Sequence, residues 1–75
     1  MNGPKNRDEF LLLLDDLAPE LNVFILKEVV NRSIPEIAEQ VALYAFVEGL
    51  TDPRLEILRA YLKELKTTGM YTFEA

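Results

Sequence analysis

The sequence predicts an all-α fold, a compact four-helix domain followed by a short extended C-terminal tail. Two observations predict it. Hydrophobic residues make up 49% of the 75 residues, and most of them recur at helical spacing. Two capping boxes and two proline restarts then divide the chain into four helical segments. We expect one domain over residues 1–75, with only residues 1–5 frayed.

The first helix is expected to end near Leu17. Asn6 followed by Glu9 forms an N-cap with its capping-box partner. Asp8 and Glu9 lie in the first turn, where negative charge favours the positive end of the helix dipole. The apolar residues that follow fall on one stripe: Phe10, Leu13, Leu14 and Leu17.

The second helix is expected from about Pro19 to Asn31. Apolar residues cover more than half of its circumference, which predicts a central position in the fold. Its many β-branched residues make a strand the competing prediction. The apolar set is Leu21, Val23, Ile25, Leu26, Val29 and Val30.

The third helix begins after the capping box of Ser33 and Glu36. Its buried face would be Ile37, Ala38, Val41, Ala42 and Ala45. Continuing the same phase would place Glu48 in the middle of that face, so we expect the regular helix to end near Leu43.

The fourth helix is expected from Pro53 to about Thr67, with Asp52 as N-cap and Gly69 as its stop. Its predicted buried stripe is Leu55, Leu58, Leu62 and Leu65. The segment from Met70 to Phe73 has two aromatics two residues apart, which is typical of an extended segment packed on a core.

Composition argues against an enzyme. The chain has no cysteine and no histidine, which excludes disulfides, zinc fingers and imidazole chemistry. Asp15 and Asp16 point about 100° apart on a helix and so do not converge on one atom. Ser33 has a capping role and lacks a base in a recognisable motif. We predict no catalytic residue, no metal and no cofactor.

Apolar residues outside the stripes are candidate anchors for a protein partner. Leu12 lies opposite the core stripe among Asp8, Asp15 and Asp16, which is typical of an apolar contact rimmed by charge. Phe24 shares a polar sector with Glu20. Ile57 and Tyr61 form an i, i+4 pair beside the leucine stripe. The competing interpretation for each is burial against another part of the fold. The predicted partner-binding set is Leu12, Phe24, Ile57 and Tyr61, with Asp8, Asp15, Asp16 and Glu20 as steering charges.

Charge disfavours autonomous binding of nucleic acid. The formal net charge is −5, and residues 1–50 hold 9 acids against 4 bases. A phosphate backbone would be repelled, whereas a basic protein would be attracted. Only Arg59, Lys63 and Lys66 form a basic strip, and Glu56 and Glu64 interrupt it. A solvated helix face is the competing interpretation of that strip.

A family resemblance covers residues 21–73. The segment SIPEIAEQV resembles the first helix of a helix-turn-helix, and PRLEILRAYLKELKTTGMYTF is similar to a second helix with an aromatic segment after it. In this order they resemble the helix-turn-helix variant domain of proteobacterial conjugative-element regulators. The long turn YAFVEGLTD and the mixed charge of the second helix depart from a DNA reader, so the motif is degenerate.

The resemblance implies a small antiactivator that binds and inhibits a transcriptional activator, such as a quorum-sensing or conjugative-transfer regulator. The alternatives are a DNA-binding regulator that uses Arg59, Lys63 and Lys66, and a self-associating structural module. The longest apolar runs are far shorter than the roughly 20 residues of a membrane helix. We therefore expect no membrane association. We also expect the protein to be cytoplasmic and to be a monomer or weak homodimer.

Overall fold

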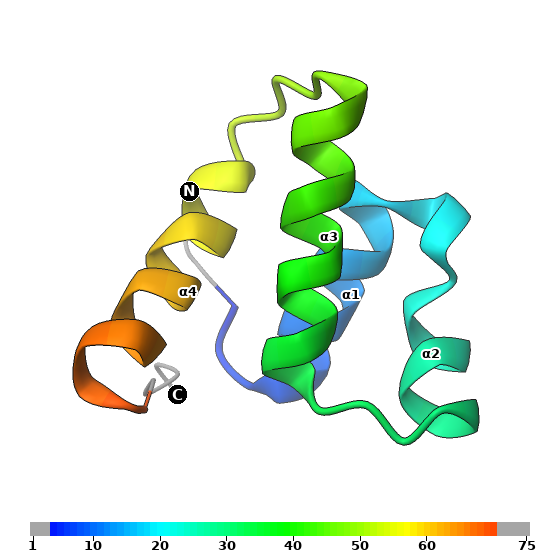
Figure 1. Ribbon diagram of the computed structural model, residues 1–75, viewed down its shortest axis with the longest axis horizontal. Coiled ribbons are helices and arrows are strands. Elements are labelled where there is room, and N and C mark those ends of the chain that lie inside the picture. The colour runs from blue at the N-terminus through cyan, green and yellow to red at the C-terminus, as the bar shows by residue number, and fades with distance from the viewer. Residues whose placement is uncertain (1–3, 71–75) are drawn as a thin grey trace.

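The computed structural model describes residues 4–70, and its described part is all-α (Figure 1). Four α-helices and one short 3₁₀ helix account for its regular structure, and no strand occurs among these residues. The elements are α1 (Arg7–Leu17), η1 (Pro19–Leu21), α2 (Val23–Val29), α3 (Ile34–Glu48) and α4 (Leu55–Thr68). The predicted fold class is confirmed. Residues 71–73 of the expected extended tail, and residues 1–3 of the expected frayed segment, lie outside the described residues.

α1 begins and ends where its capping chemistry predicts. The Asn6 side chain accepts a hydrogen bond of 2.9 Å from the Glu9 amide, and the Glu9 carboxylate accepts one of 3.1 Å from the Lys5 amide. The first bond satisfies one of the amides that a helix start leaves without a partner, and the second binds the residue before the N-cap to the first turn. After Leu17, Ala18 leaves the helical region with φ −140°.

The expected second helix is interrupted, so that prediction is wrong. Asn22 adopts a left-handed conformation with φ 53°, which ends η1 and separates it from α2. Asparagine is one of the few residues that enters this region readily. Asn31, with φ 51°, lies in the same region just beyond α2.

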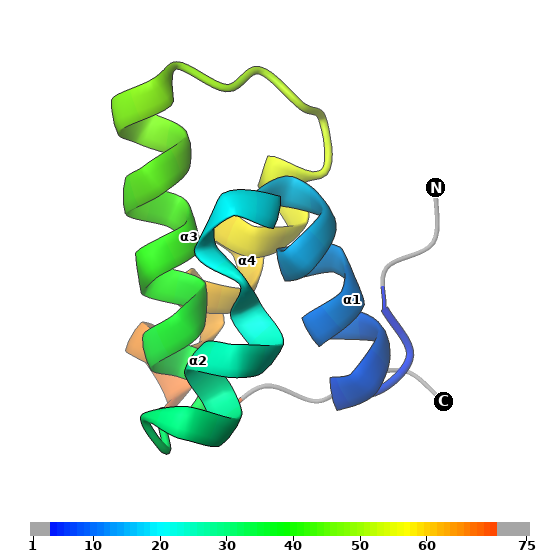
Figure 2. The ribbon, with the colours of Figure 1, turned by 90° about the vertical axis from the view of Figure 1, so that its right-hand side faces the viewer.

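The predicted central position of this segment is also wrong. Val23 is the buried residue of α2, whereas Ile25 and Val29 are 51% and 75% exposed. A helix of seven residues has only about two turns, so few of its residues can face the core. Figure 2 shows α2 on the outside of the domain, in front of α1 and α3.

α3 begins at the predicted cap but runs beyond its predicted end at Leu43. The Ser33 hydroxyl accepts a hydrogen bond of 3.5 Å from the Glu36 amide. The helix continues to Glu48, because that carboxylate is exposed beyond the edge of the core. Gly49, with φ 68°, then ends α3: its amide bonds to the Phe46 carbonyl at 3.3 Å, and the following amide reaches back to the last turn. This pairing is a Schellman motif.

α4 starts two residues later than expected, after a turn at Pro53 and Arg54. The Asp52 carboxylate accepts a hydrogen bond of 2.9 Å from the Arg54 amide within that turn. Gly69, with φ 80°, is the predicted stop. Leu55 and Leu58 are buried as expected.

The core lies where α3 packs against α1, α2 and α4. In Figure 1, α3 stands between α4 and α2 with α1 behind it, and α4 descends in the direction opposite to α3. The buried residues come mainly from α1, α3 and α4: Phe10, Leu11, Leu14, Leu17, Ala18, Val23, Ile34, Ile37, Ala38, Val41, Ala45, Leu55, Leu58 and Tyr61. No helix of the described part is long and apolar enough to cross a bilayer.

Candidate partner-binding surface

Leu12 lies on the solvent side of α1, as its sequence position predicts. The residue is 59% exposed, whereas Leu11 and Leu14 on either side of it are buried. Asp8 and Asp16 flank it at i−4 and i+4, so carboxylates border this apolar contact point.

Asp16 is an ion-pair partner within the fold. Its carboxylate pairs with the guanidinium of Arg54, which also binds the Asp52 carboxylate at 2.7 Å. The Arg54 guanidinium lowers the pKa of Asp52 to about 2, and the two carboxylates raise the pKa of Arg54. This cluster joins the end of α1 to the turn before α4, so part of the charge of Asp16 is already compensated by Arg54.

Glu20 is likewise bound within the fold, at the contact between η1 and α3. Its carboxylate accepts a hydrogen bond of 2.7 Å from the Tyr44 hydroxyl. The bond raises the pKa of Tyr44 to about 12 and lowers the pKa of Glu20. Both groups remain open to solvent, so Glu20 still contributes negative charge to this side of the molecule.

Phe24 is 40% exposed and is accompanied by other uncovered apolar residues of α2. Ile25 and Val29 stand one turn apart on the outer side of that helix, and Val30 follows at its end with 50% of its surface exposed. The apolar surface of α2 is therefore broader than Phe24 alone.

Tyr61 is a core residue, which corrects its interpretation as an exposed anchor. It is 4% exposed, and its ring centroid lies 4.3 Å from that of Phe10. Ile57 is half-buried. α4 turns Tyr61 toward the start of α1, so the buried side of α4 is wider than the leucine stripe, and Leu62 and Leu65 are only partly covered.

The basic strip of α4 is exposed, and one of its charges is paired. The Arg59 guanidinium lies 2.9 Å from the Glu56 carboxylate. Within residues 4–70, Lys63 and Lys66 form no ion pair. The strip thus presents few free cations for a phosphate backbone.

Sequence reasoning missed an apolar surface at the C-terminal end of α3. Leu43, Phe46 and Val47 are 58%, 85% and 69% exposed, and they stand at i, i+3 and i+4 on the side away from the core. We refer to these three residues as the α3 apolar trio. The signal that could have revealed it is Gly49, because reading that glycine as a helix stop extends α3 through all three residues.

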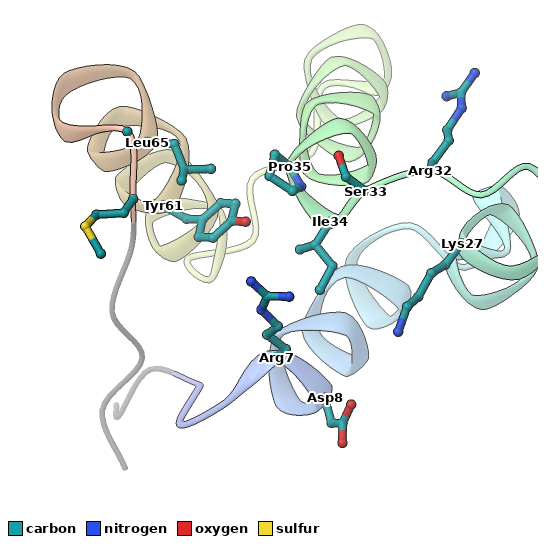
Figure 3. A pocket seen from close by; sticks show the side chains of 11 residues that line it. Arg7, Asp8, Lys27, Arg32, Ser33, Ile34, Pro35, Tyr61 and Leu65 are labelled. Carbon is teal, nitrogen blue, oxygen red and sulfur yellow. The ribbon is translucent and has the colours of Figure 1, made fainter.

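A pocket of about 590 Å³ lies between the starts of α1 and α3 and the end of α4. Figure 3 shows Arg7 pointing into it between Tyr61 and Ile34, while the guanidinium of Arg32 points away. The cations around the pocket therefore do not converge on one point. Within the described residues, no group of three acidic, histidine or cysteine side chains is placed to hold a metal ion.

No protein-family model, curated protein or solved structure matches this chain. Its function is therefore inferred from the surface described above and from the resemblance in the sequence.

Proposed function

We propose that the chain is a small acidic antiactivator that binds a transcriptional activator and blocks it by occupying a surface required for dimerisation or DNA binding. The activator would be a quorum-sensing or conjugative-transfer regulator, as the sequence resemblance implies. Since such regulators act on DNA inside the cell, the proposal places the chain in the cytoplasm. It requires no catalytic residue, metal or cofactor.

The observation that carries the proposal is the grouping of exposed apolar side chains on the outer sides of α2 and α3. Single exposed hydrophobic residues are ordinary on protein surfaces. On α2 and α3, however, they recur at helical spacing, so they are neighbours on the helix surface, as is typical of protein-binding surfaces. The large exposed residues are Leu12, Phe24, Ile25, Val29, Val30, Leu43, Phe46, Val47 and Met70.

The charge of the chain supports an activator as partner. A DNA-binding protein presents a basic surface to the phosphate backbone. A chain with a formal net charge of −5 is attracted to that surface and competes with DNA for it. A micromolar Kd corresponds to about 8 kcal/mol, which a few well-packed apolar anchors can supply.

A mobility-shift experiment tests the proposal. Activators encoded in the same genome are purified and bound to labelled promoter DNA, and the chain is added in increasing amounts. We expect the activator–DNA complex to disappear, while the chain alone leaves DNA unshifted at low salt. Unchanged DNA binding by every activator would overturn the antiactivator proposal. A shift by the chain alone, lost on changing Arg59, Lys63 and Lys66 to glutamine, would instead establish the DNA-binding alternative.

A further inference from the structure

The outer side of α3 has two successive blocks of opposite character, one beginning at Glu36 and the other seven residues later at Leu43. In the first block, Glu36, Glu39 and Gln40 are exposed. In the second block, the α3 apolar trio occupies the corresponding positions, each residue seven positions further along. Because seven residues are close to two helical turns, both blocks lie on one side of the helix, about 10 Å apart.

The charged residues on this side of α3 are two glutamates, Glu36 and Glu39. The helix contains Glu36, Glu39 and Glu48 and no lysine or arginine. Arg54 lies beyond the C-terminal end of α3, but two carboxylates already bind it. A partner that covers the α3 apolar trio would therefore meet carboxylates one block away with no cation on the same helix to balance them.

A second copy of the chain fits this side poorly. Two α3 helices packed parallel would oppose glutamates with glutamates, and packed antiparallel they would lay each apolar trio on the other chain's glutamates. A shifted antiparallel pair could join the trios alone. Three side chains from each copy are far fewer than the roughly 20–30 residues a side of a stable interface.

We propose that the outer side of α3 is the docking surface for a basic amphipathic helix of the partner protein. Apolar residues of that helix would pack on Leu43, Phe46 and Val47 as ridges into grooves, and lysines or arginines about 10 Å further along would face Glu36 and Glu39. The inference rests on the proposed function only in requiring that the chain binds proteins, and it names the chemistry of the bound element.

Synthetic helices of about 18 residues test the docking surface, because they span both blocks of α3. The first peptide carries leucines at helical spacing in one half and lysines on the same side in the other half. A second peptide replaces the lysines with glutamates, and a third moves the lysines to the opposite side. Fluorescence anisotropy with labelled peptides gives each Kd. We expect binding by the first peptide, weakening with added salt, and binding at least about tenfold weaker by the other two.

Matched variants of the chain locate the binding site. Phe46→Ser changes a residue that is 85% exposed, so we expect the variant to retain the fold, and circular dichroism checks this. We expect it to weaken binding of the first peptide about tenfold or more. Ala60→Ser changes an exposed residue of α4 that lies outside the surfaces proposed for binding, and it is expected to leave the Kd unchanged. The double variant E36Q/E39Q should weaken binding a few-fold and reduce its salt dependence.

The results distinguish this inference from the proposed function. Equal binding of the lysine and glutamate peptides, no binding of any peptide, or equal losses in the Phe46 and Ala60 variants would each overturn the docking surface on α3. If the first peptide binds through α3 and no activator is displaced from DNA, the docking surface stands and the antiactivator proposal fails. If activators are displaced equally well by the Phe46→Ser chain, the antiactivator proposal stands and the docking surface fails.

Discussion

The Tyr44 hydroxyl donates a hydrogen bond of 2.7 Å to the Glu20 carboxylate, and this bond ties η1 to α3. The two residues are 24 positions apart in the chain. The bond fixes the segment that turns the chain from α1 into α2, so it helps to place the exposed residues of α2 beside α3.

Tyr44→Phe is expected to lower the free energy of unfolding slightly at neutral pH, because the ring stays packed while the bond is lost. The pKa of Tyr44 is raised from 10.0 to about 12, so the contribution of the hydroxyl is complete below pH 10 and is lost as pH rises toward 12. Urea unfolding of Tyr44→Phe and the natural chain measures the difference in their free energies of unfolding, and this difference should narrow as pH rises from 10 to 12. A difference that stays constant to pH 12 would contradict this role. Glu20→Gln serves as control, since its amide oxygen can still accept the bond.

Asp52→Asn is expected to reduce stability at neutral pH and to have little effect in strong acid. The pKa of Asp52 is lowered from 3.8 to about 2, so its contribution is complete above about pH 4 and is lost as pH falls through 2. The measurement is the unfolding midpoint of both proteins between pH 2 and pH 7. Glu56→Gln is the matched control, because its pair with Arg59 is exposed and should contribute little. Equal effects of the two substitutions would show that the ion pairs of Arg54 with Asp16 and Asp52 stabilise the fold no more than the exposed pair of Arg59 and Glu56.

Leu14→Ala and Leu12→Ala make the same change on opposite sides of α1. Leu14 is fully buried, so its substitution should lower the free energy of unfolding by about 2–5 kcal/mol. Leu12 is 59% exposed, so its substitution should change that free energy by less than about 0.5 kcal/mol. The total free energy of unfolding of a domain of this size is roughly 4–11 kcal/mol, so Leu14→Ala removes a large part of it. Chemical denaturation measures both values. Similar losses in the two variants would contradict the packing of α1.

Asn22→Ala is expected to lower the free energy of unfolding by about 1 kcal/mol, because alanine enters the left-handed region poorly. Asn22 has φ 53°, and its side chain makes no capping hydrogen bond, so the substitution isolates the backbone effect. Asn22→Gly, which tolerates this conformation, should stay within about 0.5 kcal/mol of the natural chain. Thermal unfolding of the three proteins checks the order. An alanine variant as stable as the natural chain would mean that the break between η1 and α2 carries no strain.

The sequence predicted the fold class and several helix ends, because caps act within a few residues. Asn6, Ser33 and Gly69 each fulfil their predicted role through groups close by in the chain. The end of α3 could not be placed in the same way. Periodicity treats a polar residue on the buried side as a stop, but Glu48 lies past the edge of the core, which only the packed structure defines.

The candidate surface was predictable only in part, because exposure depends on distant contacts. Leu12 and Phe24 are exposed as expected. Tyr61 is covered because Phe10 of α1 packs against its ring, and Asp16 meets Arg54, 38 positions away. No local pattern reports such pairings. The α3 apolar trio was hidden by the misplaced end of its helix.

The uncovered end of α3 has a consequence for the behaviour of the protein in concentrated solution. At neutral pH, mutual repulsion between chains of formal charge −5 opposes contact through these apolar side chains. Near pH 4.6, the isoelectric point, that repulsion vanishes while Phe46 stays uncovered, so the chain should reach its solubility minimum and precipitate there. Colloidal stability in this chain thus depends on its carboxylates.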